Sequence, residues 1–269
     1  GATLAQWSGD IPTTGFVGSD YPAYNFVNIL SYDETLIGAQ AHYDSGFVDV
    51  SNITDGLPDG EGRFVFVNGP DMCEVIGAPV KGTVSLTPSF TNSSTVLFND
   101  GWNLAANSYQ CTIDWDAATG WTRSDIDGTI YMWDNDLQQW ATYTGGGVGV
   151  NGGSRYIAPQ QGFWMKANAG GAVYSMTEAV KVDQYVAFVR ENESFYSATI
   201  ELAIYGNNWS DETALVVREG AELGFDPQYD GHKLRSTNES VPSLFTLSDD
   251  DEPLELSINT FGTLQEGQL

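Results

Sequence analysis

Apolar and polar residues alternate with a period of two in many short stretches of the chain, which is the pattern of half-buried β-strands. In RFVFVN at 63–68, Phe64 and Phe66 fall on one face and the valines on the other. KGTVSLTPSF at 81–90 alternates in the same way. No segment beyond about ten residues shows a strong helical period. The pattern therefore predicts an all-β fold with at most short helices.

Turn residues between apolar runs predict several hairpins. TIYMW and WATY flank DNDLQQ in the stretch 129–143, and LFTLSDDDEPLELSI at 244–258 indicates a hairpin with an acidic tip. MCEVIG at 72–77 is predicted to return on 63–68, and AVYSM at 172–176 to return on the strand GFWMKAN before it. These hairpins are typical of small antiparallel sheets.

Two further segments carry different predictions. GGGVGVNGGS at 145–154 is rich in glycine and is predicted to be a flexible loop. DWDAATGWTRSD at 114–125 indicates one short helix, with Asp114 or Asp116 as its N-cap.

Two segments about 100 residues apart share a similar pattern of apolar and polar residues. GRFVFVNG at 62–69 matches GFWMKANA at 162–169, and each follows a loop that contains proline. A degenerate duplication of a β unit is one interpretation, and chance similarity between β-hairpins is the other. The predicted organisation is a row of small β-sandwich-like modules: 1–95 as a degenerate first copy, 96–180 as the second copy, and 181–269 as a β-sandwich domain truncated at its C-terminus.

The charge of the chain is strongly unbalanced, with 36 acidic and 10 basic residues and a net charge of −26. Nucleic acid is therefore excluded as a partner, because phosphate binding requires clustered Lys and Arg. No run of 18 apolar residues is present, so no membrane insertion is expected. The acids are interpreted as keeping an aromatic-rich β protein soluble, with bound calcium as a compatible second role.

Clustered carboxylates on loops suit calcium, which prefers hard oxygen ligands. The candidate ligands lie in SDETALVVREGAELGFDPQYDGHKL and are Asp211, Glu212, Asp226 and Asp230. A second acidic group comprises Asp125, Asp127 and DND at 134–136. The spacing is not that of an EF-hand, and the alternative is that Asp and Asn shape turns and cap strand ends.

Aromatic rings suggest a second kind of site, because flat rings stack on sugars. The candidates for glycan binding are Trp121, Trp133, Trp140 and Trp209. The alternative is that these rings fill a small β core. The two cysteines, Cys73 and Cys111, are predicted either to form a disulfide or to remain as two buried thiols.

No motif in the chain indicates catalysis. GVGVNG at 147–152 satisfies the glycine spacing of a dinucleotide site, but Pro159 and a β pattern follow it where a helix is needed. The two histidines, His42 and His232, lie in no G-x-S-x-G or H-E-x-x-H context. We therefore expect no enzymatic activity.

Three pieces carry a family resemblance: GWNLAANSYQCTIDWD at 101–116, TIYMWDNDLQQWATY at 129–143 and IAPQQGFWMKAN at 157–168. They resemble β-rich modules of large secreted and cell-surface proteins of Bacteroidota, which are cargo of the type IX secretion pathway. The proline turn of that family, Asn-Pro-Tyr-Pro, is here NSYQ at 107–110, and a disulfide of Cys111 would replace its rigidity.

The resemblance implies an extracellular or cell-surface location and a role in an adhesin or surface appendage. The start GATLAQW and the end SINTFGTLQEGQL favour truncation at both ends, which fits this resemblance. The predicted function is a non-enzymatic structural or adhesive segment, with a place in a filament or surface appendage as one form of this role. The alternative is a carbohydrate-binding module. The expected partners are other protein subunits or neighbouring modules of the same long chain, and surface glycans under the alternative.

Overall fold

The structure is a computed structural model that describes residues 2–37, 43–69, 73–92, 97–186, 199–206 and 208–262. Strands, turns and single 3₁₀ turns make up this part of the chain, which confirms the predicted all-β class. The 3₁₀ turns have three or four residues each: η1 Leu4–Gln6, η2 Glu34–Leu36, η3 Tyr43–Gly46, η4 Leu97–Asn99 and η5 Glu178–Val180. In the ranges described, no helix has the length and apolar character needed to cross a membrane.

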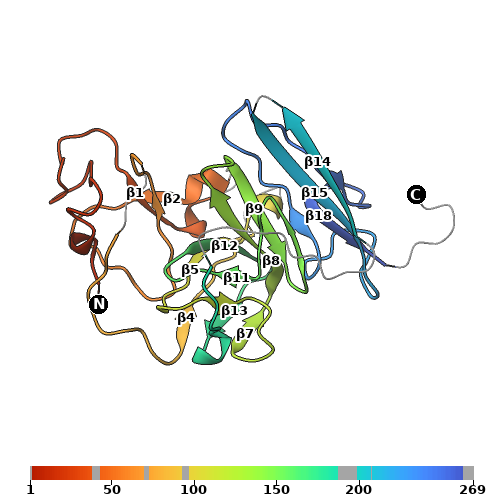
Figure 1. Cartoon of the computed structure of the whole chain (residues 1–269), viewed down its shortest axis with the longest axis horizontal. Coiled ribbons are helices and arrows are strands. Elements are labelled where there is room, and N and C mark those ends of the chain that lie inside the picture. The colour runs from red at the N-terminus through yellow and green to blue at the C-terminus, as the bar shows by residue number, and fades with distance from the viewer. Residues whose placement is uncertain are drawn as a thin grey trace.

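A five-stranded antiparallel sheet lies at the centre of the molecule (Figure 1). Its order is β10 (Val148–Val150), β9 (Gln139–Thr144), β8 (Ile126–Asp134), β12 (Gly162–Ala167) and β5 (Trp102–Ala106). β8 and β9 form the hairpin predicted in 129–143, with Trp133 directly opposite Trp140.

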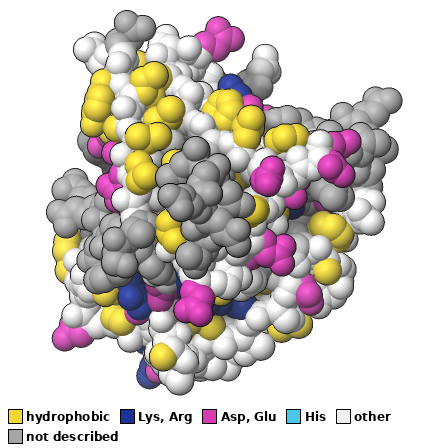
Figure 2. All heavy atoms as spheres, turned by 90° about the vertical axis from the view of Figure 1, so that its right-hand side faces the viewer, with side chains coloured by type: hydrophobic (Ala, Val, Ile, Leu, Met, Phe, Trp, Pro, Cys, Tyr) yellow, Lys and Arg dark blue, Asp and Glu magenta, His cyan; other side chains and the backbone are white. Residues whose placement is uncertain are grey.

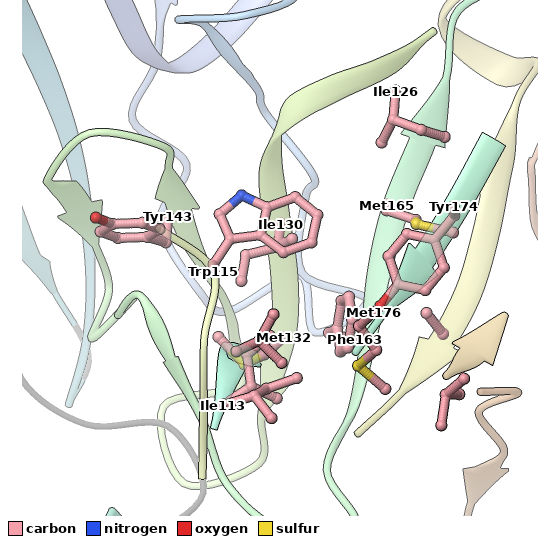
Figure 3. Close-up of a cluster of buried hydrophobic side chains, with 14 of the residues drawn as sticks. Ile113, Trp115, Ile126, Ile130, Met132, Tyr143, Phe163, Met165, Tyr174 and Met176 are labelled. Atoms are coloured by element: carbon pink, nitrogen blue, oxygen red, sulfur yellow. The ribbon is translucent and has the colours of Figure 1, made fainter. Parts of the chain in front are cut away.

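One face of this central sheet packs against a small second layer. The layer contains β4 (Val84–Leu86), β13 (Val173–Met176) and β7 (Trp121–Ser124) in that order, and the pair β6 (Ile113–Asp114) and β11 (Tyr156–Ile157). The main core fills the space between, and it includes Trp115, Ile130, Phe163, Tyr174 and Met176 (Figure 3). Aromatic rings supply much of the buried area, as the composition suggests.

The opposite face of the central sheet carries a second aromatic cluster. Because side chains alternate along a strand, Phe163 and Met165 point into the main core while Trp164 points the other way. Trp164 packs there against Tyr32 and Phe47 at centroid distances of 4.5 and 5.7 Å. These two rings belong to an N-terminal sheet of order β2 (Phe47–Asp49), β1 (Ile29–Tyr32) and β3 (Phe64–Val65).

The C-terminal sheet lies on the other side of the central sheets from the N-terminal end (Figure 1). Its order is β14 (Thr199–Gly206), β15 (Trp209–Val217), β18 (Glu255–Phe261) and β16 (Gly231–His232), and β17 (Thr246–Leu247) also pairs with β18. The β17–β18 pairing confirms the hairpin predicted in 244–258. Val148 and Val150 of β10 pack against Ala214, Val216 and Ile258 of this sheet.

Four local predictions are wrong. The glycine-rich segment 145–154 contains the buried strand β10, and 114–125 contains a turn and β7 but no helix. β13 does not return on β12, since it pairs with β4 and β7. Residues 73–77 contain no strand, and 70–72 of the predicted return strand lie outside the described residues.

The predicted division into units 1–95, 96–180 and 181–269 stays a prediction, but hydrogen bonds cross both of its boundaries. β4 of the first unit pairs with β13 of the second. The Val182 N–H donates to the Thr112 carbonyl at 3.0 Å, and the His232 N–H donates to the Tyr131 hydroxyl at 2.8 Å. The three parts therefore share sheets and cores.

The close packing of β10 gives a testable prediction. A Cβ at Gly149 would overlap the carbonyl oxygen of Gly153, and a Cβ at Gly153 would overlap that of Thr142. We expect Gly149→Ala and Gly153→Ala each to lower the free energy of unfolding by about 1–3 kcal/mol, measured by urea denaturation. Gly170→Ala is the control, because a Cβ there meets no atom within 4 Å. Unchanged stability in the first two variants would show that this segment is loosely packed.

Candidate functional site

Five ionisable side chains lie buried where the three parts of the chain meet, and we call them the charged core cluster. The members are Glu34, Asp100, Asp127, Lys166 and His232, and each is at most 5% exposed. They come from η2, the residue after η4, β8, β12 and β16 respectively. Such a concentration of buried charge in a pattern of apolar strands makes this cluster the first candidate for a functional site.

Glu34 ties the N-terminal part to the centre of the molecule. Its Oε1 accepts hydrogen bonds from the backbone N–H of Gly101 at 2.9 Å and from the N–H and hydroxyl of Thr91, both at 3.0 Å. Three donors on one oxygen of a buried carboxylate stabilise its negative charge.

Lys166 is the cation of the cluster. Its Nζ donates to the backbone carbonyl oxygen of Asp100 at 2.7 Å and lies 6.0 Å from the ring centroid of Trp102. Burial lowers the pKa of Lys166, while the negative charges of Asp127, Asp100 and Glu34 act in the opposite direction.

Asp127 faces Lys166 from the neighbouring strand β8. Its Oδ1 accepts a hydrogen bond from Asn168 Nδ2 at 3.0 Å. Burial raises the pKa of Asp127 to about 6, although Lys166 and Asn168 favour the charged form.

His232 is enclosed by rings. The ring of Phe225 stacks on the imidazole with a distance of 4.4 Å between ring centroids. The ring of Phe98 lies edge-on to the imidazole, with a centroid distance of 5.2 Å. Neither ring nitrogen has a hydrogen-bond partner among the described residues, and Nε2 lies 4.0 Å from Asp127 Oδ2. Burial and the positive charge of Lys166 hold the pKa of His232 well below its usual range, so the imidazole is neutral and forms no ion pair with Asp127.

The arrangement joins parts of the fold instead of presenting reactive groups. A catalytic acid or base must reach its substrate, and these side chains are almost wholly enclosed by protein. Their charges do constrain the three parts of the chain, because separating them would leave Lys166 or Glu34 without its partners in an apolar interior. The sequence analysis did not single out Glu34, Asp100 or Lys166. The available signal was Lys166 within the apolar run GFWMKAN, in a chain with only 10 basic residues.

The four predicted calcium ligands do not come together. Asp211 is fully buried, and its carboxylate accepts hydrogen bonds from Asn151 Nδ2 at 2.8 Å, from the Leu244 N–H at 2.6 Å and from Lys233 Nζ. Glu212 points elsewhere and accepts from the Asn151 N–H at 2.7 Å. Because N–H donors occupy both oxygens of Asp211, its surroundings do not fit a metal ion.

Asp226 and Asp230 lie in a separate turn. The Oδ2 of Asp230 accepts from the Asp226 N–H at 2.8 Å, and its Oδ1 accepts from the Thr260 N–H at 2.6 Å. Burial raises the pKa of Asp230 to about 7 despite these bonds. In the described ranges no three His, Cys, Asp or Glu side chains are grouped to hold a metal ion. Asp226 and Asp230 therefore shape a turn, as the alternative predicts, and calcium binding by the four residues stays a prediction.

The four predicted glycan-binding tryptophans occupy three places. Trp121 packs against the main core and donates from Nε1 to the Asp114 carbonyl at 2.8 Å. Trp133 and Trp140 meet edge-on at 5.3 Å, both half-buried. Trp209 lines an open hollow of about 380 Å³ at the end of the β14–β15 hairpin, with Tyr205, Gly206, Asn208 and Ser210.

The predicted disulfide is not formed in the structure. Cys111 is a free thiol that packs against the main core, and burial raises its pKa. Cys73 is exposed. The loop NSYQ is held by other means, because Asn107 Nδ2 donates to the carbonyls of Cys111 and Ala158, both at 2.9 Å. Of the two histidines, His42 lies outside the described residues.

Comparison of the chain with protein-family models, curated proteins and solved structures gives no match.

The charged core cluster predicts a pH dependence of stability. Asp127 has a higher pKa in the folded protein, about 6, than the ordinary value of 3.8 that applies in the unfolded chain. The stability that its proton contributes is therefore fully present below 3.8 and is lost as the pH rises to about 6. We expect Asp127→Asn to reduce the dependence of the unfolding free energy on pH within this window, measured by urea denaturation at several pH values.

The control for this prediction is Asp249→Asn, which removes the same charge from an exposed position. A slope that is equally reduced in both variants would mean that general charge repulsion, and not the proton on Asp127, causes the pH dependence.

Proposed function

We propose that this chain is a non-enzymatic structural or adhesive segment of a large extracellular or cell-surface protein. It joins a second copy or a neighbouring module through the open edge of β14. The single observation that carries the proposal is that β14 is an edge strand whose outer side is unpaired and apolar in the described part of the chain. The sequence resemblance to secreted modules of Bacteroidota supports the location.

β14 lies at the edge of the C-terminal sheet, and among the described residues β15 is the strand that pairs with it. Ile200, Leu202 and Ile204 alternate along it and are 52%, 45% and 41% exposed. Monomeric proteins usually protect such edges with Lys, Pro, a bulge or a very short strand. β14 has eight residues, TIELAIYG, and a single charge, Glu201.

The surface around this edge is also apolar. Figure 2 faces the side of the molecule that carries the C-terminal sheet, and hydrophobic side chains gather in the upper part of the view, at the level of the β14–β15 hairpin. An added strand would pair its backbone with the open edge and cover these side chains, which is the usual geometry of recognition by strand addition.

The packing behind β14 is suited to holding this edge strand at the surface under mechanical load. Its partner β15 is anchored by Ala214 and Val216 against β10, and β10 belongs to the central sheet. Force on the edge strand would therefore pass into the central sheet through a shared core.

The first test is self-association. We expect the protein to form oligomers or filaments with increasing concentration, detected by light scattering and negative-stain electron microscopy. Leu202→Lys places a charge in the open edge and should weaken association about tenfold or more, since each tenfold corresponds to about 1.4 kcal/mol.

Ile76→Lys is the matched control, because it adds the same charge at an exposed apolar position outside the C-terminal sheet. Dispersed monomers of the wild type at every concentration, alone and with a neighbouring module, would refute the proposal.

A second candidate function, glycan binding, is favoured by one observation. The hollow at the hairpin end exposes Tyr205, which is 78% exposed, next to Trp209 and Asn208. Exposed rings give sugars an apolar surface, and an amide such as that of Asn208 can bind a hydroxyl.

This candidate is tested on a glycan array. If the hollow binds sugar, the wild type gives specific hits and Tyr205→Ala reduces their affinity at least about tenfold, the loss of one stacking contact of about 1.4 kcal/mol. Tyr185→Ala removes another fully exposed ring and should leave the hits unchanged. An array without hits removes the candidate.

A further inference from the structure

Lys233 and Asp211 form a buried pair in which the amine and the carboxyl group are in contact. Asp211 lies in β15, and Lys233 directly follows β16, so the two flank the central strand β18 from opposite sides. The Lys233 N–H donates to the Glu255 carbonyl of β18 at 2.8 Å, which fixes its backbone. Lys233 Nζ contacts Asp211 Oδ2, and the two side chains are 2% and 0% exposed.

The Asp211 carboxyl group is held in one orientation. Its Oδ1 accepts hydrogen bonds from Asn151 Nδ2 at 2.8 Å and from the Glu212 N–H at 2.9 Å. Its Oδ2 accepts from the Leu244 N–H at 2.6 Å and from Lys233 Nζ. The amine therefore approaches the carboxyl group at one oxygen, while two N–H donors hold the other oxygen. Holding reacting groups in contact in this way removes much of the entropic barrier to a reaction between them.

Enclosure also favours the neutral form of the amine. Burial lowers the pKa of Lys233, because the interior disfavours its charged form. Transfer of one proton from the ammonium to the carboxylate turns a buried ion pair into a neutral amine and a neutral carboxylic acid. The neutral pair has no charge to desolvate, and the neutral amine is a nucleophile.

We infer that Lys233 and Asp211 are joined in the folded protein by an intramolecular amide bond between Nζ of Lys233 and Cγ of Asp211. The amine attacks Cγ, and the charge that develops on Oδ1 is stabilised by Asn151 Nδ2 and the Glu212 N–H, as in an oxyanion hole. Oδ2 leaves as water with one proton from the carboxylic acid and one from the amine. Atoms and charge balance, and no oxidant or further reactant is required.

The half-buried Arg155 and the buried Lys166 do not meet these conditions. Arg155 pairs with Asp114 through its guanidinium, which stays protonated and is not a nucleophile. Lys166 Nζ donates to the carbonyl oxygen of Asp100, which belongs to a backbone amide. Lys233 is thus distinguished by a buried carboxyl group held against its amine, whereas Lys181 meets the exposed carboxylate of Glu178 at 3.5 Å.

The bond would close a covalent ring through residues 211–233, which contains β15 and β16 on either side of β18. The ends of β15 and β16 that carry Asp211 and Lys233 could then not separate from each other without breaking a covalent bond. This inference goes beyond the proposed function, and it depends only on the geometry of the pair.

Intact mass spectrometry of the denatured, reduced protein tests the inference. We expect a mass lower than that of the sequence by one water molecule. Trypsin should leave Lys233 uncut and yield residues 191–218 and 219–235 as one linked species, lighter by one water than their sum. A full sequence mass, or a water loss that maps to other residues, overturns the inference.

Two variants complete the test. Lys233→Arg keeps a cation beside Asp211 but has no nucleophilic amine, so its mass should equal that of its sequence. Lys181→Arg removes the lysine amine that meets the Glu178 carboxylate near the surface and should retain the water loss. Water loss that persists in Lys233→Arg contradicts the assignment. If Lys233→Arg does not fold, the peptide map of the wild type decides alone. The masses are independent of the microscopy, so a full mass leaves the proposed function standing.

Discussion

Buried charge must be compensated inside the protein, and this constraint governs how the parts of the chain fit together. Lys166 is enclosed on β12, and the acids around it come from η2, from the end of η4 and from β8. Burial of an ion pair adds little net stability, but loss of one partner costs several kcal/mol. The charged core cluster therefore works through specificity: an alternative packing of the N-terminal or C-terminal part would leave Lys166 or Glu34 without partners.

The same logic applies in the C-terminal sheet. Lys233 and Asp211 lie on opposite sides of β18, and Asn151 of the central region completes the donors around the carboxylate. Apolar contacts of β10 with β15 and β18 close the interface nearby. Polar groups thus fix the register of elements whose aromatic and aliphatic surfaces could pack in more than one way.

The outer edge of β14 is unpaired among the described residues, and this edge on a closely packed body is the basis of the proposed role in assembly. The interior is closely packed on both faces of the central sheet, whereas β14 leaves backbone and apolar side chains exposed. Molecules that exist alone usually protect such an edge, because it recruits other strands. The contrast between interior and edge is the physical basis of the proposed function.

The sequence by itself determined the all-β class, the hairpins in 129–143 and 244–258, and the aromatic character of the core, because these follow from local alternation and turn chemistry. It did not determine the strands that pair with β13, the strand in 145–154 or the groups with which the acidic residues interact. Asp211 and Asp226 look alike in the sequence, yet one pairs with a buried lysine and the other shapes a turn. Only the tertiary structure decides this, because the pairing of a charge depends on residues far away in the chain and on the water that packing excludes.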